Sequence, residues 1–140
     1  MKREVILDTN ILVAALRSRR GASHELVRLI GQGEWRVNIS VALALEYEDV
    51  LKRPNMLRGF SVQDVDDFID YILSASNLVA FVPRRRPRLQ DPNDEQILEL
   101  AVRSQAMIVT HNTKDFAGAE RLGVVVRTPA EFLVMLRLDQ

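Results

Sequence analysis

The sequence predicts an α/β fold in which a parallel sheet of about five strands is covered by helices on both faces. Short, uninterrupted runs of apolar residues recur along the whole chain, and segments with a helical spacing of apolar residues lie between them. Continuous apolar runs are typical of strands that are buried on both faces. The 140 residues contain no repeat and no long linker, so we expect a single domain over residues 1–140.

The first half of the chain is expected to hold two strands and four helical segments. Ser40 and Ser61 each stand before an apolar-periodic segment and are expected N-caps, while Gly31 and Pro54 end two of the segments. In chain order we expect a strand at 5–7, helices at 11–16 and 26–30, a strand at 35–39, a helix from Ser40 to about residue 53, and a helix that opens at Ser61.

The second half repeats this alternation. Thr128 followed by Pro129 predicts the start of the last helix, because threonine suits the N-cap position and proline the first turn. In chain order we expect a strand at 78–82, a basic loop at 84–90, a helix at 92–104, strands at 107–109 and 124–126, and the final helix.

Four acidic residues from distant parts of the chain are expected to meet. Asp8 and Asp115 follow expected strands, Glu46 lies in the helix after the second strand, and Asp94 opens the helix before the fourth. Ligands of parallel sheets gather beyond the carboxyl ends of the strands. Because neighbouring carboxylates repel one another, such a group indicates a hard cation, Mg²⁺ or Mn²⁺.

Three of these acids also have purely structural interpretations. Asp8 could cap the first helix. Asp94 suits the third helical position, where the helix dipole favours an acid, and Asp91 three residues earlier suits the N-cap better than a metal shell. Asp115 could cap a short turn. Sequence patterns leave these alternatives open.

Glu46 is singled out by its place on a helical wheel. It lies closer to the buried face than Glu48 or Asp49, and an acid at the edge of a buried face needs a partner. That partner is either a metal site or an arginine in a salt bridge, and Glu48 is the weaker candidate. The buried face itself is defined by Leu43, Tyr47, Val50 and Leu51.

Composition limits the possible functions. Nineteen basic residues balance nineteen acidic ones, so any nucleic-acid contact must come from a local patch. There are no cysteines, which excludes disulfides and thiolate metal sites. The longest apolar run covers residues 11–16, so we expect no signal peptide or membrane span, and a cytoplasmic protein. His24 and His111 are not expected to be general bases, although His111 could touch substrate.

A basic segment, comprising Arg84, Arg85, Arg86 and Arg88, precedes Asp91. One interpretation is a phosphate track that leads a nucleic acid to the acidic site. The alternatives are a solvated loop and an anchor for an acidic partner. Arg17, Arg19 and Arg20 form a second cluster with the same ambiguity.

Four sequence elements together resemble the PIN-domain family, which includes the VapC-type toxins of bacterial toxin–antitoxin pairs. The resemblance covers nearly the whole chain, and the four elements occur in the family's order and spacing. They are LDTNIL at 7–12, LEYEDVLKRP at 45–54, DPND at 91–94 with ILELA at 97–101, and IVTHNTKDF at 108–116.

The resemblance implies a three-layer α/β/α, doubly wound, Rossmann-like sheet and an endoribonuclease that cleaves single-stranded RNA with Mg²⁺ or Mn²⁺. It also implies a toxin with an antitoxin partner, and a homodimer. The alternative is a non-catalytic PIN-like module that binds RNA or protein. The implied acidic site consists of Asp8, Glu46, Asp94 and Asp115, with Glu46 bound directly or through a water. The implied supporting residues are Asn10, Thr110 and Asn112. Some branches of the family carry an aspartate in place of Asn112, so here the fourth carboxylate must come from Asp115 or is missing.

Overall fold

The computed structural model describes residues 2–81 and 92–139. Five strands and six α-helices alternate in this part of the chain, together with two short 3-10 helices. The elements are β1 (Arg3–Leu7), α1 (Thr9–Arg17), α2 (Ala22–Arg28), β2 (Trp35–Ile39), α3 (Val41–Leu51), α4 (Val62–Ser74), β3 (Asn77–Leu78), α5 (Pro92–Ser104), β4 (Met107–Val109), η1 (Thr113–Phe116), η2 (Ala119–Leu122), β5 (Val126–Arg127) and α6 (Pro129–Leu138).

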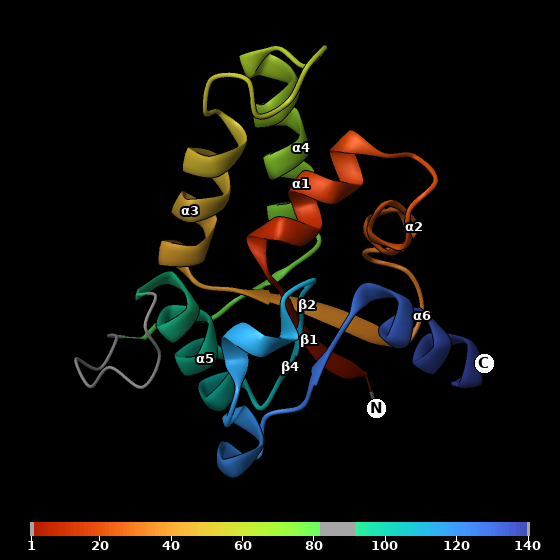
Figure 1. The fold of residues 1–140 in the computed structure, drawn as a ribbon, viewed down its shortest axis with the longest axis vertical. Coiled ribbons are helices and arrows are strands. Elements are labelled where there is room, and N and C mark those ends of the chain that lie inside the picture. Colours follow the sequence, from red (N-terminus) through yellow and green to blue (C-terminus); the bar gives the residue numbers. More distant parts are fainter. Residues whose placement is uncertain (1, 82–91, 140) are drawn as a thin grey trace.

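The five strands form one parallel sheet in the order β3-β2-β1-β4-β5. Strand β1 therefore lies at the centre of the sheet. The first half of the chain adds β2 and β3 on one side of β1, and the second half adds β4 and β5 on the other side, which confirms the expected parallel α/β fold. Figure 1 shows α5 and α6 on opposite sides of the central strands. Helix α2 packs against α1 and α6, whereas α3 packs against α4 and α5.

Local sequence signals account for where the helices begin. The Ser40 hydroxyl accepts the N–H of Leu43 at 3.0 Å, so the predicted N-cap of α3 is confirmed. Ser61 and Thr128 cap α4 and α6, and each exchanges hydrogen bonds with an acid three residues on, in a capping box. Pro129 occupies the first turn of α6, as expected.

Two strands differ from the prediction. The strand expected at 78–82 is β3, which covers only Asn77–Leu78, although the N–H of Val79 still donates to Ile39 O. The strand expected at 124–126 is β5, which covers Val126–Arg127. The N–H of Val124 donates to the carbonyl oxygen of Ala119, the first residue of η2, so Val124 belongs to the end of that turn. The two 3-10 helices were not predicted, since each is a single short turn.

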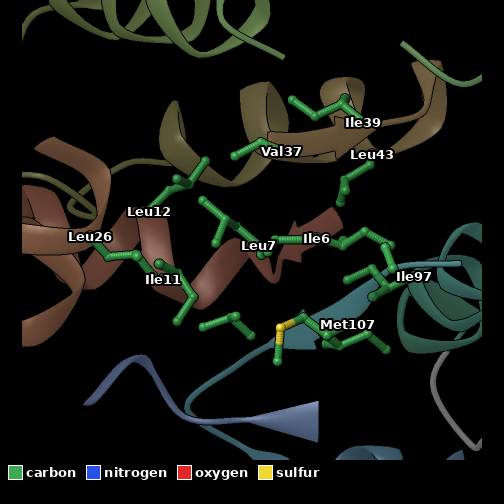
Figure 2. Close-up of a cluster of buried hydrophobic side chains, with 14 of the residues drawn as sticks. Ile6, Leu7, Ile11, Leu12, Leu26, Val37, Ile39, Leu43, Ile97 and Met107 are labelled. Atoms are coloured by element: carbon green, nitrogen blue, oxygen red, sulfur yellow. The ribbon is translucent and has the colours of Figure 1, made fainter. Parts of the chain in front are cut away.

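The core forms on both faces of β1. Val5, Ile6 and Leu7 are fully buried, and their side chains pack with residues from both helical layers. Figure 2 shows these contacts, in which side chains from β1, α1, α2, β2, α3, α5 and β4 meet in one cluster. Burial of both faces explains why the strand is an uninterrupted apolar run. No helix in the described ranges is long and apolar enough to cross a membrane.

Candidate active site

Asp8 directly follows β1 and occupies the N-cap position of α1, yet its side chain makes no capping hydrogen bond. The carboxylate is instead turned toward the end of β4, where Oδ2 accepts the Thr110 hydroxyl at 2.7 Å. The amide of Asn10 lies 3.3 Å from the same oxygen. Asp8 is only 8% exposed, so the structure buries a carboxylate at the carboxyl end of the central strand without using it as a cap.

Glu46 lies on the face of α3 that approaches α1. It is half-buried, whereas Glu48 and Asp49 are exposed, so the helical-wheel prediction is confirmed. The Thr9 hydroxyl donates to Glu46 Oε2 at 2.6 Å. Glu48, the weaker candidate, instead forms an exposed ion pair with Lys52 on the protein surface. Because Thr9 is the neighbour of Asp8, the hydrogen bond brings Glu46 to the start of α1.

Tyr47 connects the two acids and was not predicted to take part in the site. Its buried hydroxyl donates to the carbonyl oxygen of Leu7, the residue before Asp8. Burial, and then the charges of Asp8 and Glu46, raise the pKa of the Tyr47 phenol well above its usual value. Because Leu7 and Thr9 flank Asp8 and bond to Tyr47 and to Glu46, the two hydrogen bonds bring Asp8 and Glu46 together.

Replacing Tyr47 by phenylalanine is expected to destabilise the protein by about 1–3 kcal/mol, because it leaves the buried Leu7 carbonyl without its donor. Urea unfolding with EDTA measures the change. Tyr71→Phe is the control, since the Tyr71 ring is partly exposed and its hydroxyl makes two longer bonds of 3.3 Å. An equal loss of unfolding free energy in the two variants would show that the Tyr47 hydroxyl contributes no more to stability than a partly exposed one.

Thr110 and Asn10 form a polar network around Asp8. Thr110 is fully buried, and its hydroxyl accepts the amide of Asn10 at 3.3 Å as well as donating to Asp8. The backbone N–H of Asn112 donates to the same hydroxyl at 3.0 Å. The side chain of Asn112 is exposed, so in this structure Asn112 supports the network through its backbone.

Asp94 and Asp115 are placed by neighbouring elements. Asp94 is the third residue of α5 and half-buried, and α5 packs against both β1 and α3. Asp115 is exposed in η1, which packs against α5 and β5, and its backbone N–H donates to Asn112 O. Asp91 lies outside the described residues, as do Arg84, Arg85, Arg86 and Arg88.

The donors suit a hard cation in kind, since carboxylate, hydroxyl and amide oxygens are the ligands that Mg²⁺ and Mn²⁺ prefer. Among residues 2–81 and 92–139, however, no three acidic or histidine side chains lie close enough to hold one metal ion. The structure thus brings together Asp8 and Glu46, and the completion of the site by Asp94 or Asp115 stays a prediction.

An open hollow of about 520 Å³ lies along α1 and is lined at one end by Thr9 and Asn10, the two residues that follow Asp8. Its lining combines polar and apolar side chains from α1 with Val50 of α3, and includes Arg17, the last residue of α1. The Arg17 guanidinium is held by the carbonyl oxygen of Met56. The lining residues are Thr9, Asn10, Val13, Ala14, Arg17, Ser18 and Val50.

A sequence model of the PIN domain matches residues 4–114, which contain most of β1, three of the four acids (Asp8, Glu46 and Asp94) and the Thr110 network. The chain belongs to the PIN domain family. No curated protein matches the chain.

Solved structures of the same fold include a chain in the crystal structure of VapBC2 from Rickettsia felis bound to a DNA fragment from the promoter. It has a TM-score of 0.62 and 19% identity, over 89% of this PIN domain and 98% of that chain. A chain in VapBC-1 from nontypeable Haemophilus influenzae is similar at a TM-score of 0.63 and 17% identity, over 91% of this chain and 98% of that one. At these identities the likeness shows the fold.

Proposed function

We propose that this PIN domain is a divalent-metal-dependent endoribonuclease that cleaves single-stranded RNA and acts as the toxin of a toxin–antitoxin pair. The observation that carries the proposal is that Asp8 and Glu46 are joined at the carboxyl end of β1, where Thr9 and Leu7, the neighbours of Asp8, bond to Glu46 and Tyr47. Membership of the PIN domain family supports the activity, and the likeness of the fold to chains of two VapBC assemblies supports the toxin role.

Asp8 and Glu46 would hold Mg²⁺ or Mn²⁺, with Glu46 bound directly or through a water. Asp94 would move closer to join them when the ion binds, because the three acids do not lie close enough to share one ion in this structure. Asp115 would complete the site, because Asn112 offers no charge. When bound, the cation neutralises the scissile phosphate and makes a water nucleophilic near neutral pH. No side chain of the protein then has to form a covalent bond with the RNA.

The remaining residues orient these acids and receive the substrate. The hydroxyls of Thr9 and Thr110 hold Glu46 and Asp8 by hydrogen bonds of 2.6 and 2.7 Å, so each carboxylate keeps a defined direction. The hollow along α1 begins at Thr9 and Asn10 and ends at Arg17. A single strand lying in it would place a phosphate beside the acids and a second one beside the guanidinium.

Cleavage by an Asp94→Asn variant tests the proposal. We expect the wild type to cut a labelled single-stranded RNA in the presence of Mn²⁺ and the variant to bind the RNA without cutting it. Asp67→Asn is the control, because Asp67 is an exposed acid on α4 whose carboxylate accepts a hydrogen bond from the Gln63 amide. This variant should cut the RNA like the wild type. RNA binding without cleavage by the wild type would instead favour the alternative, a non-catalytic PIN module.

Replacing Arg84, Arg85 and Arg86 together by alanine is expected to weaken RNA binding and to flatten its salt dependence. For each phosphate that the protein no longer binds, the slope of log K against log salt should fall by about 0.7 for a single strand. The slope is measured by fluorescence anisotropy in EDTA, so that no RNA is cut, and Mn²⁺ affinity should not change. An unchanged slope would mean that the basic segment is a solvated loop.

The antitoxin partner and the homodimer are parts of the same proposal. An open reading frame next to the gene should encode a small DNA-binding protein, and co-expression should yield a complex in which RNA cleavage is suppressed. Light scattering of the isolated chain measures its oligomeric state, for which we expect a dimer. The absence of an adjacent partner would remove the toxin role and leave the proposed nuclease activity.

A further inference from the structure

A side-chain contact fastens the segment that follows β4 to the helical layer beside it. His111 Nε2 lies 2.7 Å from Ser23 Oγ, although the two residues are 88 positions apart in the sequence. Ser23 belongs to α2 and is only 2% exposed, whereas His111 is exposed. Helix α2 packs in turn against α1, which carries Asn10. Neither Ser23 nor His111 has a part in the chemistry proposed above.

Hydrogen-bond donors and acceptors around Asp8 can be assigned one by one. Asn10 Oδ1 accepts the backbone N–H of His111 at 3.3 Å, so Asn10 Nδ2 must be the atom that faces Asp8. The Thr110 hydroxyl accepts from Asn10 and from the N–H of Asn112. Because a hydroxyl has one proton, that proton is left for Asp8 Oδ2.

These two donors to Asp8, the Asn10 amide and the Thr110 hydroxyl, therefore depend on the backbone of residues 110–112. The first of these residues is fixed by the sheet, since the N–H of Thr110 donates to Arg127 O. The next two residues belong to neither a strand nor a helix before η1 begins at Thr113. The contact of the His111 ring with Ser23 holds this stretch on the side where Asn10 lies.

We propose that Ser23 and His111 are positioning residues, whose hydrogen bond holds residues 110–112 against α1 and thereby aims the Asp8 carboxylate. Side chains that orient metal ligands from behind are common in metal sites and change metal affinity without touching the ion. The inference deepens the proposed function and rests on it for the metal and the reaction. The hydrogen-bond geometry itself needs neither.

His111→Ala and Ser23→Ala test the inference. In the metal-free protein, both changes should shift the side-chain amide resonances of Asn10 in ¹H–¹⁵N spectra and speed their exchange with solvent. Mn²⁺ affinity, measured by calorimetry, should fall about tenfold. If the protein cleaves RNA, kcat should fall with it while KM stays the same. His111→Gln should keep most of each wild-type value, because its side-chain amide offers the Ser23 hydroxyl both a donor and an acceptor.

Two controls match these changes. Ser76→Ala removes a serine hydroxyl that donates to Ile72 O at 2.6 Å, and His24→Gln alters a ring that contacts Ala15 O at 3.1 Å. Neither should move the Asn10 resonances or Mn²⁺ affinity. Unchanged Asn10 resonances in both alanine variants would overturn the inference, as would a rise in KM alone, which would make His111 a substrate contact. A wild-type protein that cuts no RNA would contradict the proposed function. The Asn10 resonances of the metal-free variants would still test this inference, because they depend on neither metal nor RNA.

Discussion

Replacing Asp8 by asparagine is expected to lower the rate of RNA cleavage by about a hundredfold or more. Residues that merely support metal ligands cost about 10–100-fold when they are changed, and Asp8 is proposed as a direct ligand. The substitution removes the charge but keeps an oxygen that can accept the Thr110 hydroxyl, so the fold around β1 should be retained. Single-turnover cleavage with saturating Mn²⁺ measures the effect, and RNA binding in EDTA should be unchanged.

Asp70→Asn is the matched control for Asp8→Asn, because Asp70 is an exposed acid on α4. It changes the net charge of the protein by the same amount at a place remote from β1 in the sequence. We expect it to cleave RNA like the wild type. An Asp8→Asn variant that cuts as fast as this control would show that the buried acid at the end of β1 has only a structural part.

The Asp94→Asn variant is expected to reverse its stability relative to the wild type when Mn²⁺ is added. If Asp94 belongs to a group of like charges, its removal relieves repulsion, so the metal-free variant should be at least as stable as the wild type. A cation that binds only the folded protein adds about 2.7 kcal/mol at a hundredfold excess over its Kd. The variant should lose most of this gain. Urea unfolding of both proteins, with EDTA and with Mn²⁺, gives the four free energies required.

The competing interpretation of Asp94 predicts a different pattern. Asp94 is the third residue of α5, where an acid interacts favourably with the helix dipole. Loss of this interaction should cost between a few tenths and about 1 kcal/mol, and the cost should be the same with and without Mn²⁺. Equal losses in both conditions would make Asp94 a helix-stabilising residue and would remove it from the proposed metal site.

Most of the fold could be predicted because its signals are local. Ser40, Ser61 and Thr128 each begin a helix at the expected position, since a capping side chain bonds to the backbone three residues on. The ends of β3 and β5 could not be predicted in the same way. They depend on which backbone groups a neighbouring segment uses, as when Ala119 O takes the N–H of Val124.

The positions of Asp8 and Glu46 in the fold were predictable, and the contacts of their neighbours were less so. Asp8 stands out because it interrupts an apolar strand, and Glu46 because it lies beside the buried face of its helix. Thr9 and Tyr47 take part in the site through hydrogen bonds to Glu46 and to Leu7, which lie 37 and 40 positions away in the sequence. No local sequence pattern reveals such contacts. The same holds for Ser23, since serine near the start of a short helix has many ordinary explanations.

Cleavage of RNA under controlled metal conditions tests the central claim most directly. Purified protein is freed of metal with EDTA and incubated with a labelled RNA that contains one single-stranded and one duplex segment, before and after Mn²⁺ or Mg²⁺ is restored. We expect no cutting in EDTA and internal cutting of the single-stranded segment once the cation is present. Cleavage that persists after thorough chelation would contradict the metal mechanism, and no cleavage under any of these conditions would contradict the proposed nuclease activity.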